Sequence, residues 1–374
     1  MVDAKMAHFG LRLFALICEN ANSPVVLISP LSISTALSLA AAGASSGGAA
    51  EAELLSALGV SDHAQVAVLN AEIRAGGAEA CGVELTIANS VWVKRGVLAT
   101  YKQLLERTHD ARAEELKDSF DELNAWVAAQ TKGRIQNLIQ PPVVDPLTVA
   151  VLVNAVHFRG DWATAFTRGE TVEGTFHSPG GELAARFMRR TAAMPVHAQL
   201  AALGGAAAVR LDYGKTATFC ALLVLPPSPG IESMAEAVAG LERLSIGGVL
   251  AQLETKRVSL KLPRFKAVWG VEELIPQLRK LGLAEAFDGH GQFLQMSNSP
   301  DVTISNVLHK SEMEVAEEGT TATAATAVVM RERCARAREE SLELKFDRPF
   351  IMLVVHTPSA MPLFLGRFNR PQLT

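Results

Sequence analysis

Serine and carboxylate residues occur in this 374-residue chain in patterns that could support hydrolysis. Residues 43–47 read Gly-Ala-Ser-Ser-Gly, which fits the Gly-x-Ser-x-Gly pattern of a nucleophilic serine on a strand-to-helix turn. The residues before Gly43 have the pattern of a helix, however, so a flexible connection between two helices is the favoured interpretation. Glu317 and Glu318 are adjacent, so in an extended segment their carboxylates would point to opposite sides and would not converge on a substrate. A serine hydrolase is therefore a remote alternative, and we expect no enzyme activity.

Histidine and cysteine residues lack the spacing of a metal site. These histidines show no pairing with cysteine or carboxylate residues at ligand spacing: His109, His157, His177, His197 and His309. The cysteines have neither metal-ligand spacing nor the density of a disulfide scaffold: Cys18, Cys81, Cys220 and Cys334. The chain also has no glycine-rich phosphate-binding loop followed by a lysine. We therefore expect neither a metal nor a cofactor.

The stretch from residue 314 to residue 338 points to a different chemistry. An acidic doublet precedes Gly319, and a run made only of threonine and alanine follows it. No large side chain occurs from Gly319 to Ala327, although threonine favours extended structure. Arginines then crowd the tip around Cys334. The run could be an exposed small-residue linker, but nothing on it is too bulky to slide between two existing strands.

Hydrophobic periodicity predicts the elements that would have to position this stretch. We expect helices at residues 4–20, 30–42, 50–58, 100–108, 120–131 and 272–281. We expect strands at residues 83–93, 147–156, 219–225 and 302–315. The run 147–156 is almost continuously apolar and rich in valine, which is typical of a central strand buried on both faces. Because strands and helices follow no strict alternation, the sequence predicts an α+β fold.

Composition and charge argue against several classes of protein. A hydrophobic fraction of 49% and a charged fraction of 20% suit a globular chain with a sizeable core, which we expect to be one domain. A net charge of −4 gives no basis for nucleic-acid binding. The apolar stretch 13–18 is too short for a signal-peptide core of roughly 7–15 residues, and no stretch approaches the ~20 apolar residues of a membrane span. We therefore expect a monomer without a membrane partner, located in the cytoplasm or secreted without a leader.

Blocks along the chain resemble a known family. After the arginine-rich tip, residues 346–350 read Phe-Asp-Arg-Pro-Phe, and residues 363–371 read Leu-Phe-Leu-Gly-Arg-Phe-Asn-Arg-Pro. This pair resembles the C-terminal signature of the serpins, the serine protease inhibitors. Residues 28–33, 152–162, 262–265 and 314–330 resemble further serpin blocks in the family's order. The chain therefore resembles a serpin across nearly its whole length, and its start is similar to the leaderless ovalbumin-type (clade B-like) branch.

The resemblance implies a fold and a mechanism. The implied fold has helices packed around a large, mostly antiparallel central sheet plus two smaller sheets, in a single serpin domain of residues 1–374. A reactive loop at about residues 317–341 would be exposed to a trypsin-like serine protease, which cleaves it and is acylated by the new carboxyl end. The freed N-terminal half of the loop would then insert into the central sheet and distort the trapped protease. Such a chain would be a metastable suicide-substrate inhibitor; a non-inhibitory serpin with a chaperone, carrier or storage role is the alternative.

The hinge implied by the resemblance is made of small and acidic residues. It comprises Glu317, Glu318, Gly319, Thr320, Thr321, Ala322, Thr323, Ala324, Ala325 and Thr326. With period-two alternation, Thr320, Ala322, Ala324 and Thr326 would face the core after insertion, and none is charged. Gly319 would supply conformational freedom at the pivot. Non-inhibitory members often carry bulky, charged or proline residues here, so the sequence favours an inhibitor.

Family spacing, counted forward from the hinge, places the bait bond at Arg333–Cys334. An arginine at this place suits proteases whose specificity pocket holds a carboxylate. The segment between the tip and Phe350 is a few residues longer than is usual for the family, so neighbouring arginines stay open as rivals: Arg331, Arg336 and Arg338.

Other residues match structural parts of the family. The shutter, a polar cluster beneath the central strands, would comprise Ser29, Ser32, Asn154 and His309. Trp162 matches the aromatic residue at the breach, where the loop first enters the sheet. Ordinary core roles are the alternatives for both His309 and Trp162. Residues 64–82 contain Arg74 as their only basic residue, so no heparin site is supported.

Overall fold

The computed structural model describes residues 2–21, 23–77, 82–94, 96–117, 119–131, 133, 138–139, 150–320 and 341–374. The α-helices are α1 Val2–Asn20, α2 Pro30–Gly43, α3 Ala49–Leu58, α4 Ala64–Gly76, α5 Ala99–His109, α6 Asp121–Gln130, α7 Ile231–Leu241, α8 Ile246–Gln252, α9 Ile275–Lys280 and α10 Glu285–Asp288. Strands of the first half are β1 Val25–Ile28, β2 Val83–Val93, β3 Arg112–Glu115, β4 Ala150–Asp161, β5 Val172–Ser178, β6 Gly181–Leu200, β7 Ala206–Tyr213 and β8 Phe219–Leu225. Strands of the second half are β9 Glu254–Pro263, β10 Phe265–Glu273, β11 Ile304–Val315, β12 Gly319–Thr320, β13 Leu342–Lys345, β14 Phe350–His356, β15 Met361–Phe368 and β16 Gln372–Leu373.

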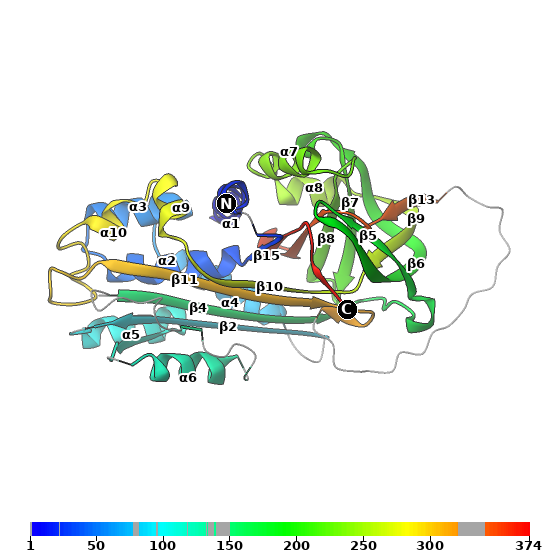
Figure 1. Ribbon diagram of the computed structural model, residues 1–374. Helices are drawn as coiled ribbons and strands as arrows, with labels where there is room; N and C mark the ends of the chain where they lie inside the picture. The colour runs from blue at the N-terminus through cyan, green and yellow to red at the C-terminus, as the bar shows by residue number, and fades with distance from the viewer. Residues whose placement is uncertain are drawn as a thin grey trace.

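A seven-stranded sheet runs along one half of the molecule (Figure 1). Its strand order is β16-β10-β11-β12-β4-β2-β3, with a direct pairing of β11 and β4 as well. The β11–β4 and β2–β3 pairs are parallel, and the other pairs in this sheet are antiparallel. In Figure 1, α6 lies below this sheet, whereas α3, α9 and α10 lie above it. The predicted α+β fold, with helices around a large and mostly antiparallel sheet, is confirmed.

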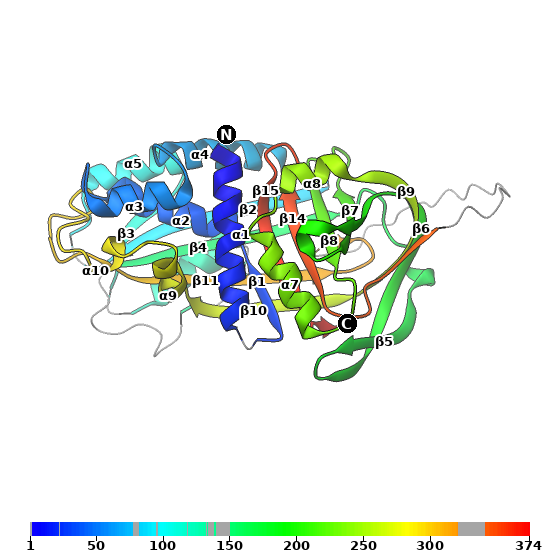
Figure 2. The same cartoon turned by 90° about the horizontal axis from the view of Figure 1, so that it is seen from above.

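A nine-stranded sheet forms the other half of the molecule. Its order is β1-β15-β14-β8-β7-β6-β9-β13, and β5 also pairs with β6. The sequence resemblance predicts two smaller sheets in this half. The 20-residue β6 pairs with β5, β7 and β9, and these pairings join the strands into a single sheet. Viewed from above, α1 crosses the middle of the molecule and α7 lies beside it over the second sheet (Figure 2).

Most predicted elements are found within a few residues of their expected bounds, because the local signals agree with the packing. Ser29 caps α2, Pro30 lies in its first turn, and Gly59 ends α3 with a left-handed φ of 68°. The predicted helix 272–281 is wrong at its start. The helix begins only at Ile275, because Glu272 and Glu273 extend β10 and pair with β11.

Apolar residues cover both faces of the seven-stranded sheet. Along β4, Ala150 and Leu152 belong to the main hydrophobic core, whereas Val151 and Val153 belong to a smaller cluster with side chains from α6. This alternation confirms the prediction of a central strand buried on both faces. Every residue of α2 is buried, and this helix packs against β2, β4 and β15.

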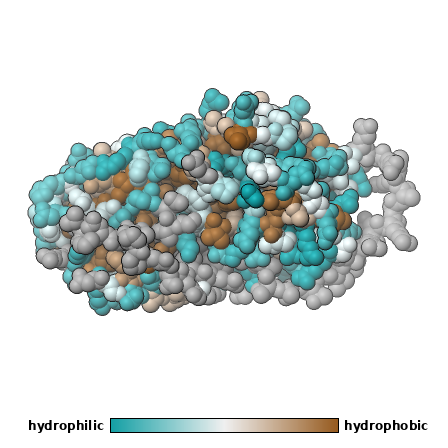
Figure 3. Space-filling view, in the orientation of Figure 1, coloured by the Kyte–Doolittle hydropathy of each residue, from teal (hydrophilic) through white to brown (hydrophobic). Residues whose placement is uncertain are grey.

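The exterior is mixed in character. On the face seen in Figure 3, hydrophilic side chains are spread over most of the surface, and hydrophobic ones show in separate places. Among the helices of the described ranges, none is long and apolar enough to cross a membrane.

Candidate functional site at the opening of the seven-stranded sheet

The seven-stranded sheet is closed at one end and open at the other. β11 and β4 pair from Ile304 opposite Ala150 to His309 opposite Asn154. Beyond this point the two strands no longer pair with each other in the described residues, and at the far end Val315 of β11 and Gly160 of β4 pair with β12 instead. On their other sides, β11 pairs with β10 and β4 pairs with β2. The interval between β11 and β4 is therefore where an added strand would pair.

β12 already enters this opening at its far end. Thr320 pairs with Val315 of β11 on one side and with Gly160 of β4 on the other. Its side chain is 1% exposed, and its hydroxyl oxygen lies 2.6 Å from the hydroxyl of Tyr213. The sequence predicts that Thr320 faces the core after insertion, and in this structure it is buried in the intact chain.

Gly319 is required by space at this point. A Cβ atom at Gly319 would lie 2.1 Å from the carbonyl oxygen of Gly160, which no side chain can tolerate without displacing the backbone. Gly319 is not among the described glycines that have a left-handed backbone. In this state glycine is needed for the close approach between β12 and β4, and its expected role as a flexible pivot stays a prediction.

Trp162 holds the bend that precedes β12. Its indole Nε1–H donates to the carbonyl of Ala316 at 2.9 Å, and its backbone N–H donates to the carbonyl of Glu318 at 2.7 Å. Its ring stacks on Tyr213 with centroids 4.5 Å apart and planes 13° apart. Trp162 thus links the end of β4 to the bend and to Tyr213, whose hydroxyl contacts Thr320. The breach role of Trp162 stays a prediction, which its indole hydrogen bond to this bend supports.

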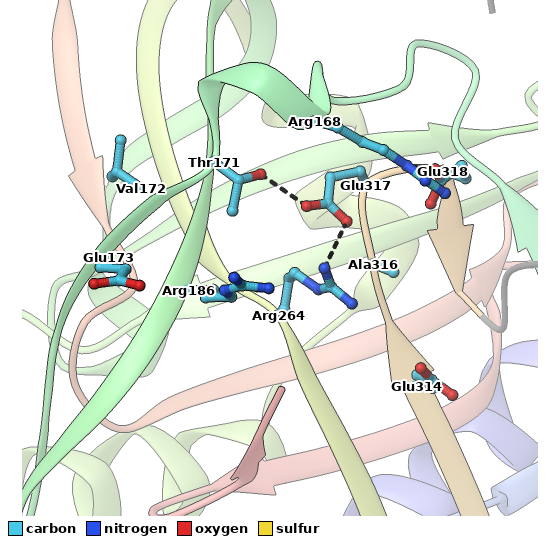
Figure 4. Close-up of a pocket in the computed structure, with 10 residues that line it drawn as sticks. All are labelled: Arg168, Thr171, Val172, Glu173, Arg186, Arg264, Glu314, Ala316, Glu317 and Glu318. Atoms are coloured by element: carbon cyan, nitrogen blue, oxygen red, sulfur yellow. Dashed lines mark hydrogen bonds and ion pairs between the residues drawn. The ribbon is translucent and has the colours of Figure 1, made fainter. Parts of the chain in front are cut away.

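Glu317 and Glu318 lie in that bend and border one pocket of about 470 Å³ (Figure 4). The expectation that an extended segment would send them to opposite sides is wrong here, because the chain bends between Ala316 and Gly319. Glu317 is 3% exposed; the Thr171 hydroxyl donates to its Oε1 at 2.7 Å, and an Arg264 nitrogen lies 3.5 Å from its Oε2.

Glu318 is held by the other side of the pocket. Its carboxylate accepts a hydrogen bond from Arg168, and this bond raises the pKa of the arginine. The two carboxylates therefore anchor the bend, each with its own arginine.

His309 lies where the closed part of the sheet ends. The backbone N–H of Ser29 donates to its Nε2 at 3.0 Å, and the Ser311 hydroxyl lies 2.7 Å from the same nitrogen. Nε2 therefore carries no proton, and burial lowers the pKa of His309 to about 3. The Ser29 hydroxyl in turn accepts the N–H of Ser32 at 3.3 Å. These contacts tie β11 to the start of α2.

Several predicted residues cannot be placed. Asn154 pairs with His309 through the backbone, but its side chain lies outside the described part of the structure. The hinge residues 321–326, the bond Arg333–Cys334 and its rivals Arg331, Arg336 and Arg338 also lie outside the described residues.

The site includes residues that the sequence does not single out. Tyr213, Thr171 and Arg264 come from separate strands or turns and carry no spacing signal relative to the hinge. Ser311 could be predicted, because residues two apart on a strand share a face and His309 was already a candidate.

The pattern at residues 43–47 lies at the end of a helix in the structure. Ser45 follows the helix α2 rather than a strand, and its hydroxyl donates to the carbonyl of Gly291 at 2.7 Å. Within the described ranges, no group of three or more His, Cys, Asp and Glu side chains is placed to hold a metal ion.

The fold and this site define a class of protein: one with a large sheet open at one end, which an adjoining segment of the same chain has begun to enter. The family model described as Serpin (serine protease inhibitor) matches residues 4–371, so the chain belongs to the serpin family.

Individual relatives agree with this assignment. Serpin B8 of Homo sapiens is 32% identical and the alignment covers 97% of each chain. The leukocyte elastase inhibitor of Equus caballus is 31% identical over 97% of this chain and 98% of its own. The crystal structure of human thyroxine-binding globulin has a TM-score of 0.85 at 23% identity, covering 99% of this chain and 98% of that one. The predicted resemblance to ovalbumin-type serpins is confirmed, and the relatives include protease inhibitors.

Proposed function

We propose that this serpin is a suicide-substrate inhibitor of trypsin-like serine proteases and not an enzyme itself. The observation that carries the proposal is the half-open sheet, in which Thr320 occupies the first position between β11 and β4. The similarity to a leukocyte elastase inhibitor supports a protease as partner. The arginine expected at the bait position supports a protease whose specificity pocket holds a carboxylate.

The covalent step follows from the chemistry of the protease. Its serine oxygen attacks the carbonyl carbon of Arg333, the bond to Cys334 breaks, and the new amine leaves with the C-terminal fragment. The N-terminal segment stays joined to the protease as an ester. Water would hydrolyse this ester and release the protease unless a faster event intervened.

Strand insertion supplies the faster event. A segment that continues β12 would meet residues 310–314 on one side and residues 155–159 on the other. Five inserted residues with both backbone groups paired form roughly ten hydrogen bonds, and at about 1 kcal/mol net for each the gain is on the order of 10 kcal/mol. Further insertion would have to separate β11 from β4 at His309, whose Nε2 accepts the Ser29 N–H from the start of α2 and also contacts the Ser311 hydroxyl within β11. We assign the shutter role to this cluster, together with Ser32 and Asn154.

The remaining parts of the proposal concern the chain as a whole. We propose that residues 1–374 act as a single domain and as a monomer, in the cytoplasm or after secretion without a leader. The similarity to ovalbumin-type relatives supports this location.

The test is to mix the protein with trypsin. We expect a covalent complex that survives boiling in detergent, a released C-terminal fragment that begins at Cys334, and a higher melting temperature for cleaved protein than for intact protein. A fragment that begins at Glu332, Ala337 or Glu339 would move the bait to Arg331, Arg336 or Arg338, respectively. Simple digestion with no gain in melting temperature would refute inhibition and favour a non-inhibitory serpin. Turnover of small esters without any protease would instead favour the hydrolase.

A further inference from the structure

Three positive charges face one another across three strands of the nine-stranded sheet. Arg189 of β6 lies opposite Lys261 of β9, and Lys345 of β13 lies opposite the same lysine on its other side. Partner residues in a sheet share a face, and neighbouring strands are about 4.8 Å apart, so the three cations fall within roughly 10 Å. Arg257 of β9 lies opposite Ala193 and is exposed on the same face. We call Arg189, Arg257, Lys261 and Lys345 the cationic row.

The cationic row does not stabilise the sheet. Like charges directly opposite each other on neighbouring strands are destabilising. Lys261 is accommodated by the Phe187 ring, whose centroid lies 4.0 Å from its Nζ, and Lys345 pairs with Glu343 at 2.8 Å. Arg189 and Arg257 are exposed and form no ion pair with any residue of the described ranges. Two charges of the row are therefore available to a partner.

The position of the row selects the partner. β13 begins at Leu342, soon after residues 321–340, which carry the expected bait. β6, β9 and β13 lie together at the end of the molecule opposite α5 and α9 in both views (Figures 1 and 2). A protease engaged on the loop is therefore held beside these strands. The chain as a whole carries a net charge of −4, so the row is a local positive field on an otherwise acidic molecule.

We propose that the cationic row is a docking surface for an acidic patch on the target protease, next to the pocket that accepts the bait arginine. This inference rests on the proposed function and adds a second criterion for the target, namely a trypsin-like specificity pocket together with an acidic rim. Charged surfaces of this kind raise the rate of association more than the final affinity. A sulfated polysaccharide would bind the same charges, but the row extends only about 10 Å across the strands and about 13 Å along β9 from Arg257 to Lys261, which suits a local patch better than an extended polyanion.

The test compares two trypsins that share arginine specificity but differ in net charge, one anionic and one cationic. For the wild type at low salt, we expect association with the anionic form to be faster by about tenfold, within the range that electrostatic steering gives. The variant Arg189→Glu/Arg257→Glu should lose or reverse this preference. The control variant Arg107→Glu/Lys280→Glu has the same change in net charge on exposed residues of α5 and α9, and it should keep the preference. High salt should remove the preference of the wild type.

Folding does not confound this comparison. Arg189→Glu places a carboxylate opposite Lys261, so the melting temperature should be unchanged or higher. If the protein is only digested by trypsin, inhibition has failed, yet the ratio of the two cleavage rates still reports docking. An equal preference in the wild type and the Arg189→Glu/Arg257→Glu variant would overturn the inference. A second outcome would also overturn the inference and favour a polyanion site. In that outcome the wild type shows no preference between the trypsins, dextran sulfate accelerates its association with both, and the Arg189→Glu/Arg257→Glu variant loses this acceleration.

Discussion

The variant Thr320→Arg separates insertion of the loop from its recognition. Thr320 is 1% exposed, lies between β11 and β4, and contacts the Tyr213 hydroxyl at 2.6 Å. A guanidinium at this position would be a buried charge without a partner, at a cost of several kcal/mol. In the intact protein, β12 can move out of the sheet at the cost of the backbone pairing of Gly319 and Thr320 with β4 and β11 and of the contact with the Tyr213 hydroxyl, each hydrogen bond being worth about 1 kcal/mol. After cleavage, insertion has to pass through this position, so the cost cannot be avoided.

The expected result is a change from inhibitor to substrate. Each 1.4 kcal/mol added to a barrier slows a step about tenfold, so about 3 kcal/mol slows insertion by a factor on the order of 100. Hydrolysis of the ester would then precede trapping. The assay measures the moles of inhibitor consumed for each mole of trypsin trapped, together with the detergent-stable complex on a gel. We expect that ratio to rise by at least tenfold while the loop is still cut at the same bond.

Two variants serve as controls. Thr320→Val keeps the shape of the side chain and its burial, and Tyr213→Phe removes only the hydroxyl while the ring keeps its place beside Trp162. Both should still trap trypsin, because neither buries a charge. If Thr320→Arg forms as much stable complex as the wild type, loop insertion past Thr320 is not what traps the protease.

Three further predictions concern stability. Burial lowers the pKa of His309 from 6.5 to about 3, so as the pH falls the unfolded chain binds this proton before the folded protein does. The free energy of unfolding should therefore keep its full His309 contribution above about pH 6.5. Between pH 6.5 and 3 it should fall by up to ~1.4 kcal/mol for each pH unit. Thermal melts of His309→Gln should show a shallower decline over this range, and an identical decline would contradict the assignment. Trp162→Phe removes the hydrogen bond to Ala316 and should cost about 1 kcal/mol in urea unfolding, whereas no measurable loss would show that the bond is not maintained in solution. Glu317→Gln and Arg264→Gln should each lower stability, and their double-mutant cycle should give a coupling on the order of 1 kcal/mol; additive effects would mean that the pair does not interact.

The elements that the sequence predicts well are those specified by neighbouring residues. The apolar run of β4, the proline and cap of α2 and the left-handed glycine after α3 are all local signals. The helix predicted at 272–281 starts too early because pairing with β11 outweighs the helical pattern of Glu272 and Glu273. Local propensity carries no information about a partner strand that lies more than thirty residues away in the sequence.

The candidate site divides in the same way. The small residues of the hinge can be read from the sequence, since only composition is needed. The burial of Thr320 in the intact chain cannot be predicted from the sequence, because it depends on Tyr213, which is 107 positions away. The shared pocket of Glu317 and Glu318 likewise depends on a bend held by Trp162 and on arginines from other elements.

The contact between Gly319 and Gly160 limits the mutational routes open to this chain. A Cβ at Gly319 would meet the Gly160 carbonyl oxygen at 2.1 Å, whereas a Cβ at Gly160 would meet the Tyr213 ring at 2.6 Å and the Phe158 ring at 2.8 Å. The two glycines are thus confined by different neighbours, a backbone atom in one case and aromatic rings in the other. Shortening an aromatic side chain could relieve a substitution at Gly160, but no side-chain change elsewhere can move a carbonyl oxygen away from position 319. A substitution at Gly319 should therefore have no simple second-site suppressor, and selection for restored inhibition should return reversions to glycine.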